Sequence, residues 1–183
     1  MTKVGLLDYG SGNLHSAARA LAAAGAEVRM SARRDELWGL DALVVPGVGA
    51  FAACMAGLSS IGGRELVVDW VASGRPLLGI CVGHQILFDQ GSERGVNTAG
   101  LGIYEGTVRQ LDAVRLPHMG WNGVVPASAS VLFRGVEDQR FYFVHSYAAA
   151  SEAPGTSSAC HEQARFVAAV ERDNVSSTQF HPE

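Results

Sequence analysis

The sequence has few charged residues, 17% of its 183 positions, and no long uninterrupted apolar run. No window approaches the roughly 18 apolar residues of a membrane-spanning helix, and the N-terminal stretch MTKVGLLDYG reaches an Asp and a Gly where a signal peptide would continue its apolar core. Basic residues are also scarce: 14 Lys and Arg stand against 18 Asp and Glu, and no basic cluster is longer than Arg33-Arg34. These absences argue against membrane-spanning, secreted and nucleic-acid-binding proteins and favour a cytoplasmic one.

Cysteine is sparse as well. Cys54, Cys81 and Cys160 are odd in number and widely spaced, which argues against a secreted disulfide framework, so each thiol is judged by its own surroundings. Apolar residues make up 48% of the chain, and together with the lack of low-complexity tracts this excludes disordered and fibrous classes. Because one domain takes about 100 to 200 residues, we expect residues 1–183 to form a single domain.

Short apolar segments alternate with helical ones in the first half of the chain. The last apolar segment, Leu77–Ile80, carries no polar residue, as is typical of a strand buried on both faces of a parallel sheet. Glycine or a Pro-Gly pair ends several of these elements. The pattern predicts strands at Lys3–Leu7, Ala26–Met30, Ala42–Val45 and Leu77–Ile80, and helices at about Asn13–Ala24, Phe51–Leu58, Arg64–Ala72 and after Cys81 to about Phe88.

From Gly95 onward the segments are shorter and are separated by glycine and proline. We interpret them as mainly β and partly antiparallel: Gly102–Gln110, Gly123–Val125, Val131–Phe133, Phe141–Val144, Phe166–Glu171 and Val175–Phe180. The predicted fold class is α/β, a central, mostly parallel sheet with helices on both faces and added antiparallel β structure in the second half. Because the chain stops at Glu183 directly after a strand, we also expect a C-terminal helix that this sequence lacks.

Cys81 is the strongest candidate for a catalytic residue. It stands between a buried strand and a helix, with Gly79 before it and Gly83 after it, which is typical of a nucleophile elbow whose backbone N–H groups stabilise negative charge. A helix N-terminus also favours a thiolate and lowers the pKa of a cysteine. A buried structural thiol fits the same short pattern, so both interpretations stay open.

A thiol nucleophile requires a base, and His181 has the best local context of the six histidines. It follows an apolar strand and precedes Pro182, which favours an extended backbone. Glu183, two residues later, then lies on the same side of the chain and could hold the imidazole tautomer, which is the arrangement of a Cys-His-Glu triad. The alternative is a surface histidine near a chain end.

Two other interpretations concern ligands. Cys81 with His84, and Cys160 with His161, have the residue types of a metal site, but no second pair stands at the spacing of zinc ligands, so we expect no metal. The glycine-rich loop Gly10-Ser11-Gly12 completes neither a dinucleotide nor a Walker A pattern, so nucleotide binding has weak support. No cofactor is expected.

A second glycine-rich loop, Pro46-Gly47-Val48-Gly49, follows the third predicted strand. Glycine on each side of Val48 lets that peptide turn its N–H toward a neighbouring active site, where it would serve as an oxyanion-hole donor. A plain strand-to-helix turn would contain the same residues.

Six blocks of the sequence, taken in order, resemble the class I glutamine amidotransferases, and specifically the glutaminase subunit of imidazole glycerol phosphate synthase. The cysteine elbow and the terminal His-Pro-Glu are shared by many class I members, whereas the other four blocks are typical of this subunit. The resemblance spans essentially the whole chain and implies a flavodoxin-like fold. The blocks are Asp8–Leu14, Pro46–Phe51, Gly79–Gln85, Leu116–Asn122, Tyr142–Tyr147 and Gln179–Glu183.

The resemblance implies a role for each matching residue. Cys81 would be the nucleophile, His181 the base and acid, and Glu183 the residue that orients His181. L-glutamine and its oxyanion would be held by Gly47, Val48, Gly49, Val82, Gln85, His145, Ser146 and Tyr147. A (β/α)₈-barrel cyclase subunit, which uses the ammonia to make imidazole glycerol phosphate in histidine biosynthesis, would form a heterodimer through Asn13, Met119, Trp121 and Asn122.

Two positions depart from the family pattern. His84 stands where this subunit usually has Met, although His is common there in other class I amidotransferases. The chain ends at Glu183, where the family continues with Lys-Ser and a helix.

The resemblance also implies that the activity is coupled to the partner subunit. We therefore expect the isolated subunit to be nearly inactive. In it, a carbonyl of the 47–49 turn, not the Val48 N–H, should be directed toward Cys81.

Two other functions are compatible with parts of the sequence. The first is the glutaminase of another class I amidotransferase, such as pyridoxal phosphate synthase, against which the Asp8–Leu14 and Pro117–Asn122 blocks argue. The second is a non-catalytic, flavodoxin-like binding module. The intact residues Cys81, His181 and Glu183 disfavour a module without activity.

Overall fold

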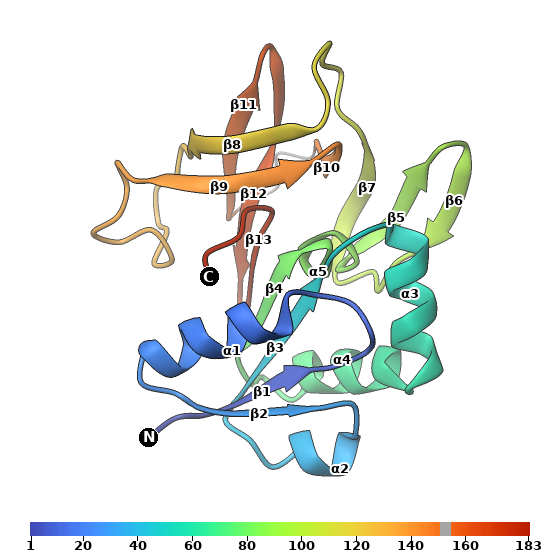
Figure 1. The fold of residues 1–183 in the computed structure, drawn as a ribbon, viewed down its shortest axis with the longest axis vertical. Helices are drawn as coiled ribbons and strands as arrows, with labels where there is room; N and C mark the ends of the chain where they lie inside the picture. Colours follow the sequence, from blue (N-terminus) through green and yellow to red (C-terminus); the bar gives the residue numbers. More distant parts are fainter. Residues whose placement is uncertain (151–154) are drawn as a thin grey trace.

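A computed structural model describes residues 1–150 and 155–183, and its centre is a seven-stranded sheet (Figure 1). The strand order is β11-β12-β13-β4-β3-β1-β2. Strands β2, β1, β3, β4 and β13 are parallel, β12 is antiparallel to β13, and β11 is antiparallel to β12. The strands are β1 (Lys3–Leu7), β2 (Glu27–Ser31), β3 (Ala42–Gly47), β4 (Leu77–Cys81), β11 (Thr156–His161), β12 (Ala164–Arg172) and β13 (Val175–Thr178).

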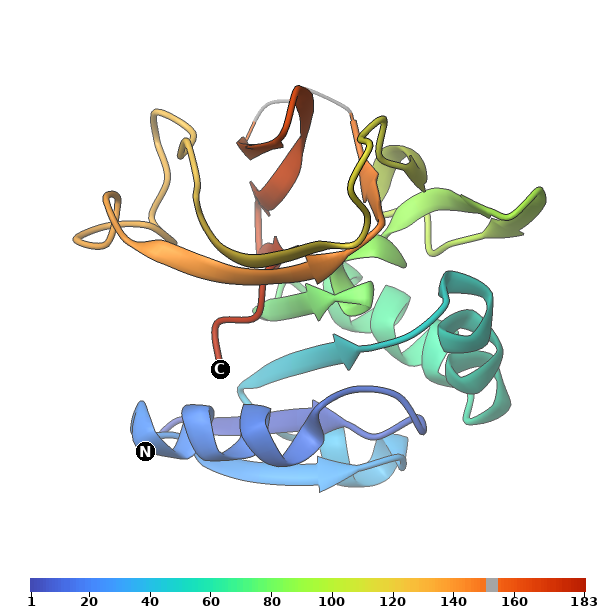
Figure 2. The ribbon, with the colours of Figure 1, turned by 45° about the horizontal axis from the view of Figure 1, so that its top comes forward.

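Helices cover both faces of this sheet. In Figures 1 and 2, α1 lies on one face and α4 on the other. Helix α1 buries Ala17 and is followed by Gly25, whose φ of 91° lets the chain turn directly into β2. The helices are α1 (Leu14–Ala23), α2 (Arg34–Leu37), α3 (Phe51–Ser60), α4 (Gly63–Ala72) and α5 (Val82–Gln85).

Two smaller sheets are added in the second half of the chain. One has the order β10-β7-β5-β6, and the other is the antiparallel pair β8-β9. Figures 1 and 2 place the C-terminal end of the chain between β9 and α1, and an isolated bridge joins Tyr142 of β9 to His181. These strands are β5 (Phe88–Glu93), β6 (Val96–Ala99), β7 (Tyr104–Gln110), β8 (His118–Gly123), β9 (Arg140–His145) and β10 (Tyr147–Ala149).

The α/β class and the alternation in the first half are confirmed, with the predicted strands and helices displaced by only a few residues at their ends. The helix predicted to reach Phe88 is wrong in length, since α5 ends at Gln85 and Phe88 begins β5. The strand predicted at Val131–Phe133 is also wrong. This segment is a turn, because the Glu171 carboxylate accepts hydrogen bonds from the backbone N–H groups of Val131 and Leu132.

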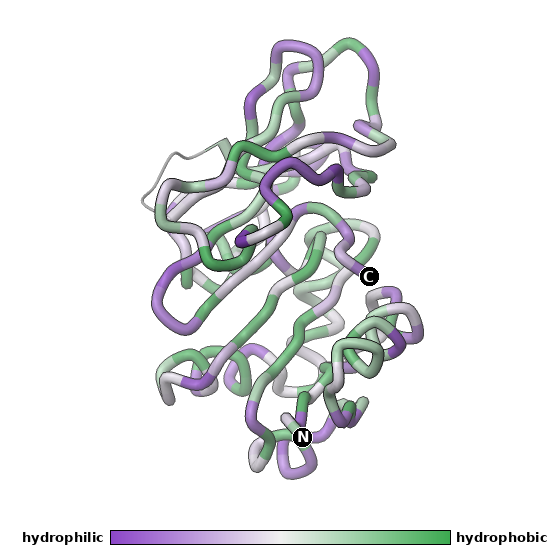
Figure 3. The backbone as a smooth tube through the Cα atoms, turned by 90° about the vertical axis from the view of Figure 1, so that its left-hand side faces the viewer, coloured by the Kyte–Doolittle hydropathy of each residue, from purple (hydrophilic) through white to green (hydrophobic). Residues whose placement is uncertain are grey.

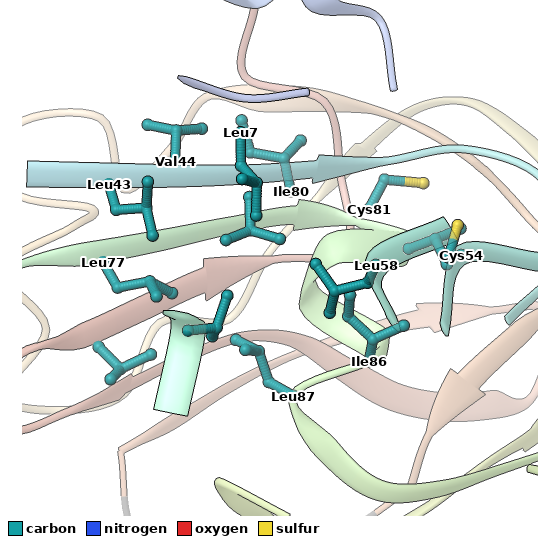
Figure 4. Close-up of a cluster of buried hydrophobic side chains, with 14 of the residues drawn as sticks. Leu7, Leu43, Val44, Cys54, Leu58, Leu77, Ile80, Cys81, Ile86 and Leu87 are labelled. Carbon is teal, nitrogen blue, oxygen red and sulfur yellow. The ribbon is translucent and has the colours of Figure 1, made fainter. Parts of the chain in front are cut away.

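The hydrophobic core has two parts. The larger part lies between the main sheet and its helices and includes Leu43 and Trp70, and the smaller part lies near β8–β9 and includes Phe143 and Phe180. Figure 3 shows the apolar stretches running through the interior strands. In Figure 4, Cys81 lies at one end of the larger cluster.

Of the helices in the described ranges, none is long and apolar enough to cross a membrane alone. Only the pair α3–α4, which is bent by 88°, has together the length and the apolar composition of a membrane-spanning segment.

Candidate active site

Cys81 occupies a tight turn between β4 and α5. Its φ of 56° and ψ of −113° are unusual for a residue with a side chain, as expected of a nucleophile elbow. A Cβ added to Gly83 would lie 1.9 Å from the carbonyl oxygen of Val45, and one added to Gly79 would lie 2.8 Å from the carbonyl oxygen of Gly83. Both glycines are therefore required for α5 to pack directly on β3 and β4, which holds the Cys81 thiol at the end of the sheet.

Strand pairing brings His181 to the same edge. Strand β13 runs parallel to β4 with Thr178 opposite Ile80, so the residues that follow each strand leave the sheet together. The backbone N–H of His181 donates to the carbonyl of Tyr142, which fixes the segment against β9. The sequence alone did not place Cys81 near His181; the parallel register of β13 with β4 brings both residues to one cavity.

His181 and Glu183 form the pair expected from the sequence. Nδ1 of His181 lies 2.9 Å from Oε1 of Glu183, and both side chains are largely buried. The Cys81 side chain and then Glu183 raise the pKa of His181 from 6.5 to about 10, while burial acts in the opposite direction. Nε2 of His181 is buried and has no hydrogen-bond partner among the described residues. It is therefore free to exchange a proton with a group held beside Cys81.

A cavity of about 220 Å³ joins these groups to most of the predicted substrate residues. It opens beside a larger cavity of about 560 Å³ that shares residues 144–147, Gly49 and Glu93. Glu93 and Val144 are two lining residues that the sequence analysis missed. The smaller cavity is lined by Val48, Gly49, Cys81, Val82, Gln85, Glu93, Val144, His145, Ser146, Tyr147 and His181.

Gln85 and Gln179 connect Cys81 to the 145–147 segment. Nε2 of Gln85 donates to the carbonyl of Tyr147 and to Oε1 of Gln179, each at 2.9 Å. Gln179 in turn directs its Nε2 at the Sγ atom of Cys81, 3.9 Å away. Gln179 is not among the site residues expected from the sequence, although a fully buried amide at the end of an apolar strand needs partners and is a signal of a site.

Both backbone polar groups of Val48 are engaged by the Ser11 side chain. The Val48 N–H donates to Oγ of Ser11 at 3.0 Å, and Oγ of Ser11 donates to the Val48 carbonyl at 2.8 Å. The thiol of Cys54 also contacts that carbonyl. Gly47 lies outside the lining of the smaller cavity and packs against Gly83. The expectation that the Val48 N–H is not directed at the oxyanion position agrees with this geometry, while the expectation that a carbonyl of the turn faces Cys81 stays a prediction.

The predicted partner-facing residues divide into two groups. Met119 and Trp121 are 61% and 66% exposed on one face of β8. Asn122 faces the other side of the strand, where its Nδ2 donates to the carbonyl of Cys160. Asn13 and Trp121 line a cavity of about 550 Å³ that also contains His181 and Glu183, so the predicted partner surface adjoins the triad residues.

His84 lies outside the cavity lining, fully buried behind the elbow. Its Nδ1 pairs with Oγ of Ser177 at 2.7 Å, and its Nε2 finds no hydrogen-bond partner in the described part of the chain. Burial lowers its pKa to about 3, so the imidazole is neutral at pH 7. Residues 1–150 and 155–183 contain no group of three or more His, Cys, Asp or Glu side chains placed to hold a metal ion.

Comparison with known proteins gives the class of enzyme to which this fold belongs. A family model described as glutamine amidotransferase class-I matches residues 5–183. In fold, the chain is similar to a solved structure described as glutamine amidotransferase, with a TM-score of 0.74 and 22% identity over 98% of this chain and 89% of that one. PurLQS from Thermotoga maritima has the same TM-score at 16% identity, over 99% and 87% of the two chains.

Relatives with higher sequence identity indicate the family within this class. The chain is 57% identical over 183 residues to the imidazole glycerol phosphate synthase subunit HisH of Cutibacterium acnes, covering 99% of this chain and 89% of the relative. It is 55% identical to the subunit of the same name from Mycobacterium tuberculosis, covering 97% and 88%. The chain therefore belongs to the class I glutamine amidotransferases, and within them to the family of the imidazole glycerol phosphate synthase subunit HisH.

Proposed function

We propose that Cys81, His181 and Glu183 hydrolyse L-glutamine to glutamate and ammonia in this chain, which acts as the glutaminase subunit of an imidazole glycerol phosphate synthase in histidine biosynthesis. The observation that carries the proposal is the meeting of the strained Cys81 elbow and the Glu183-bonded His181 in one cavity with Gln85 and the 145–147 segment. The cavity of about 220 Å³ is of a size to enclose an amino-acid side chain.

The first half of the reaction forms a thioester. The Cys81 thiolate attacks the carbon of the glutamine side-chain amide, and the amide oxygen becomes an oxyanion stabilised by backbone N–H groups. The Val82 N–H is one such donor, because the first residues of a helix have no intrahelical acceptor. The Val48 N–H would be the second once it leaves Ser11. His181 then gives the proton on Nε2 to the departing nitrogen, which leaves as ammonia.

The second half releases glutamate. His181, now neutral at Nε2, takes a proton from a water molecule, and the resulting hydroxide attacks the thioester carbon. The carbon–sulfur bond breaks and the Cys81 thiolate leaves, so the proton kept on His181 restores the thiolate–imidazolium pair. The new carboxylic acid gives its proton to solvent and leaves as glutamate. Glu183 accepts the Nδ1–H throughout, which holds the ring in the tautomer that keeps Nε2 toward the substrate.

Glutamine would lie with its reacting amide at Cys81 and its α-carbon toward the cavity mouth. Glu93 lines both the inner and the outer cavity and provides a carboxylate for the α-ammonium group. The 145–147 segment and Gln85 form the opposite wall and hold the rest of the substrate.

The relatives' name describes a synthase subunit, so a partner subunit is part of this function. We infer that the partner is a (β/α)₈-barrel cyclase that receives the ammonia. The exposed side chains of Met119 and Trp121, and the cavity that Trp121 shares with Asn13 and His181, support this face as the docking surface. Contact there would put the barrel directly beside the site of ammonia release.

The test of this function is Cys81→Ala in the complex with the candidate cyclase barrel. We expect glutamine-dependent turnover to be abolished while ammonium salts still support the cyclase, because the partner needs only free ammonia. Cys160→Ala, an exposed thiol, is the matched control and should retain activity within about threefold, under 1 kcal/mol of barrier. Loss of both activities in Cys81→Ala would assign that thiol a structural role, and no glutamate release by the unmodified complex would favour a non-catalytic module.

A further inference from the structure

We propose that His118 and His145, in fixed neutral tautomers, form a hydrogen-bonded relay that positions the Ser146–Tyr147 peptide for glutamine, which makes His118 a positioning residue outside the cavity. The inference rests on the proposed glutaminase function. His118 lies on β8 and His145 directly opposite on β9, and Nδ1 of His118 is 2.9 Å from Nε2 of His145.

The direction of every hydrogen bond in the relay follows from its two ends. At one end, Asn122 has its amide orientation set, since its Oδ1 accepts from the Gly123 N–H and its Nδ2 donates to the Cys160 carbonyl. The same Nδ2 lies 3.2 Å from Nε2 of His118, so that nitrogen is an acceptor. In a neutral ring the proton must then be on Nδ1, from which His118 donates to His145.

The other end gives the same answer independently. Nδ1 of His145 lies 3.0 Å from the carbonyl oxygen of Tyr147, which can only accept, so the proton of His145 is on Nδ1. Nε2 of His145 is left as an acceptor, which is what the Nδ1–H of His118 requires. The relay therefore runs in one direction, from the Asn122 amide through both imidazoles to the Tyr147 carbonyl.

The surroundings keep both rings neutral. Phe143 and Phe166 pack against both imidazoles, and His161 stacks on His118 with ring centroids 4.4 Å apart. Burial first, and then the neighbouring histidines, lower the pKa of His118 to about 4 and that of His145 to about 3. A second proton, on Nε2 of either ring, would face the N–H donor that this nitrogen now accepts from. The relay and the neutral state therefore support each other.

The relay acts on the substrate segment through one atom. The Tyr147 carbonyl accepts from His145 on one side and from Nε2 of Gln85, on α5, on the other. These two bonds hold the 145–147 turn between β9 and the elbow helix, and Ser146 lies at the centre of that turn in the cavity wall. Removing the His118 donor leaves Nε2 of His145 without its partner and frees the ring to rotate away from Tyr147.

The first test reads the tautomers directly. We expect nitrogen NMR of the ¹⁵N-histidine-labelled chain at pH 7 to show His118 and His145 with the proton on Nδ1, the less common form of a free histidine side chain. Single His→Asn variants assign the signals. An Nε2–H tautomer in either residue would overturn the relay, whatever the activity of the protein.

The second test uses Asn and Leu, which have nearly the same shape, at position 118 in the complex with the cyclase barrel. His118→Leu removes the donor to His145 and should raise the KM for glutamine about tenfold, with kcat within about threefold, since the segment binds substrate and does not touch the reacting atoms. His118→Asn places an amide donor where Nδ1 stood and should restore KM to within about threefold.

Two results would contradict the proposal. Equal KM values for the Leu and Asn variants, with wild-type thermal unfolding for both, would show that the hydrogen bond does not position the segment. A fall in thermal stability of His118→Leu with unchanged KM would show a packing role only. Failure of the unmodified complex to use glutamine would instead reject the glutaminase function and leave the tautomer result standing.

Discussion

The backbone N–H of Val48 donates to Oγ of Ser11 at 3.0 Å, and the same hydroxyl donates to the carbonyl of Val48 at 2.8 Å. One side chain thus satisfies both polar groups of the residue between the two loop glycines. While this pair of bonds persists, the Val48 N–H is not available to an oxyanion beside Cys81. For Val48 to serve as the oxyanion donor proposed above, its N–H must exchange Ser11 for the substrate oxygen.

Replacement of Ser11 should therefore release the loop. We expect Ser11→Ala to raise the rate of glutamate release by the isolated chain about tenfold. This gain is smaller than the roughly 10² to 10³-fold loss of rate that a missing oxyanion donor causes, because release from Ser11 only makes the N–H available. Ser60→Ala is the control, because Ser60 bonds only within its own helix region, to the carbonyl of Gly57. The measurement is glutamate release without a partner, and an unchanged rate in Ser11→Ala would show that the Ser11 bonds do not restrain the loop.

The close packing of the elbow makes a stability prediction. Gly83→Ala would place a Cβ 1.9 Å from the Val45 carbonyl oxygen. Because that neighbour is a backbone atom, the clash can be relieved only by moving the backbone. We therefore expect a loss of about 3 kcal/mol or more in the free energy of unfolding. Gly39→Ala is the matched control, since a Cβ there meets no described atom within 4 Å, and its effect should stay within about 0.5 kcal/mol. Urea unfolding of both variants checks this, and similar midpoints would show that α5 can move off β3.

The buried His84 predicts a pH dependence of stability. Its folded-state pKa is about 3 and its ordinary value 6.5, so between these values the unfolded chain binds a proton that the folded chain does not. Stability from this residue is full above pH 6.5 and falls as the pH drops, by about 1.4 kcal/mol per pH unit. His84→Met removes this contribution to the pH dependence of stability. It also removes the buried Nε2 nitrogen that lacks a partner in the described residues.

We expect His84→Met to match the wild type within about 1 kcal/mol at pH 7 and to gain about 2 kcal/mol relative to it at pH 5. Urea unfolding at both pH values measures the difference, and titration of carboxylates cancels because both proteins share it. A pH-independent difference between the two proteins would mean that His84 becomes protonated in the folded state.

The sequence by itself determined those features that depend on neighbouring residues. The apolar run before Cys81 and the glycines around it are enough to predict the elbow, because strand burial and turn geometry are local. The spacing of His181 and Glu183 is likewise enough to predict their pairing, because alternate residues of an extended chain share a side. The α/β class followed from the alternation of short apolar and helical segments.

Tertiary structure alone decided what depends on residues far apart in the chain. The parallel register of β13 with β4 brings His181 to Cys81, and cross-strand pairing joins His118 to His145. The turn at Val131–Phe133 replaced a predicted strand because Glu171, forty positions away, bonds its backbone. Local patterns carry no information on which distant donor will meet which acceptor, since sheet register and burial are set by the packing of the whole chain.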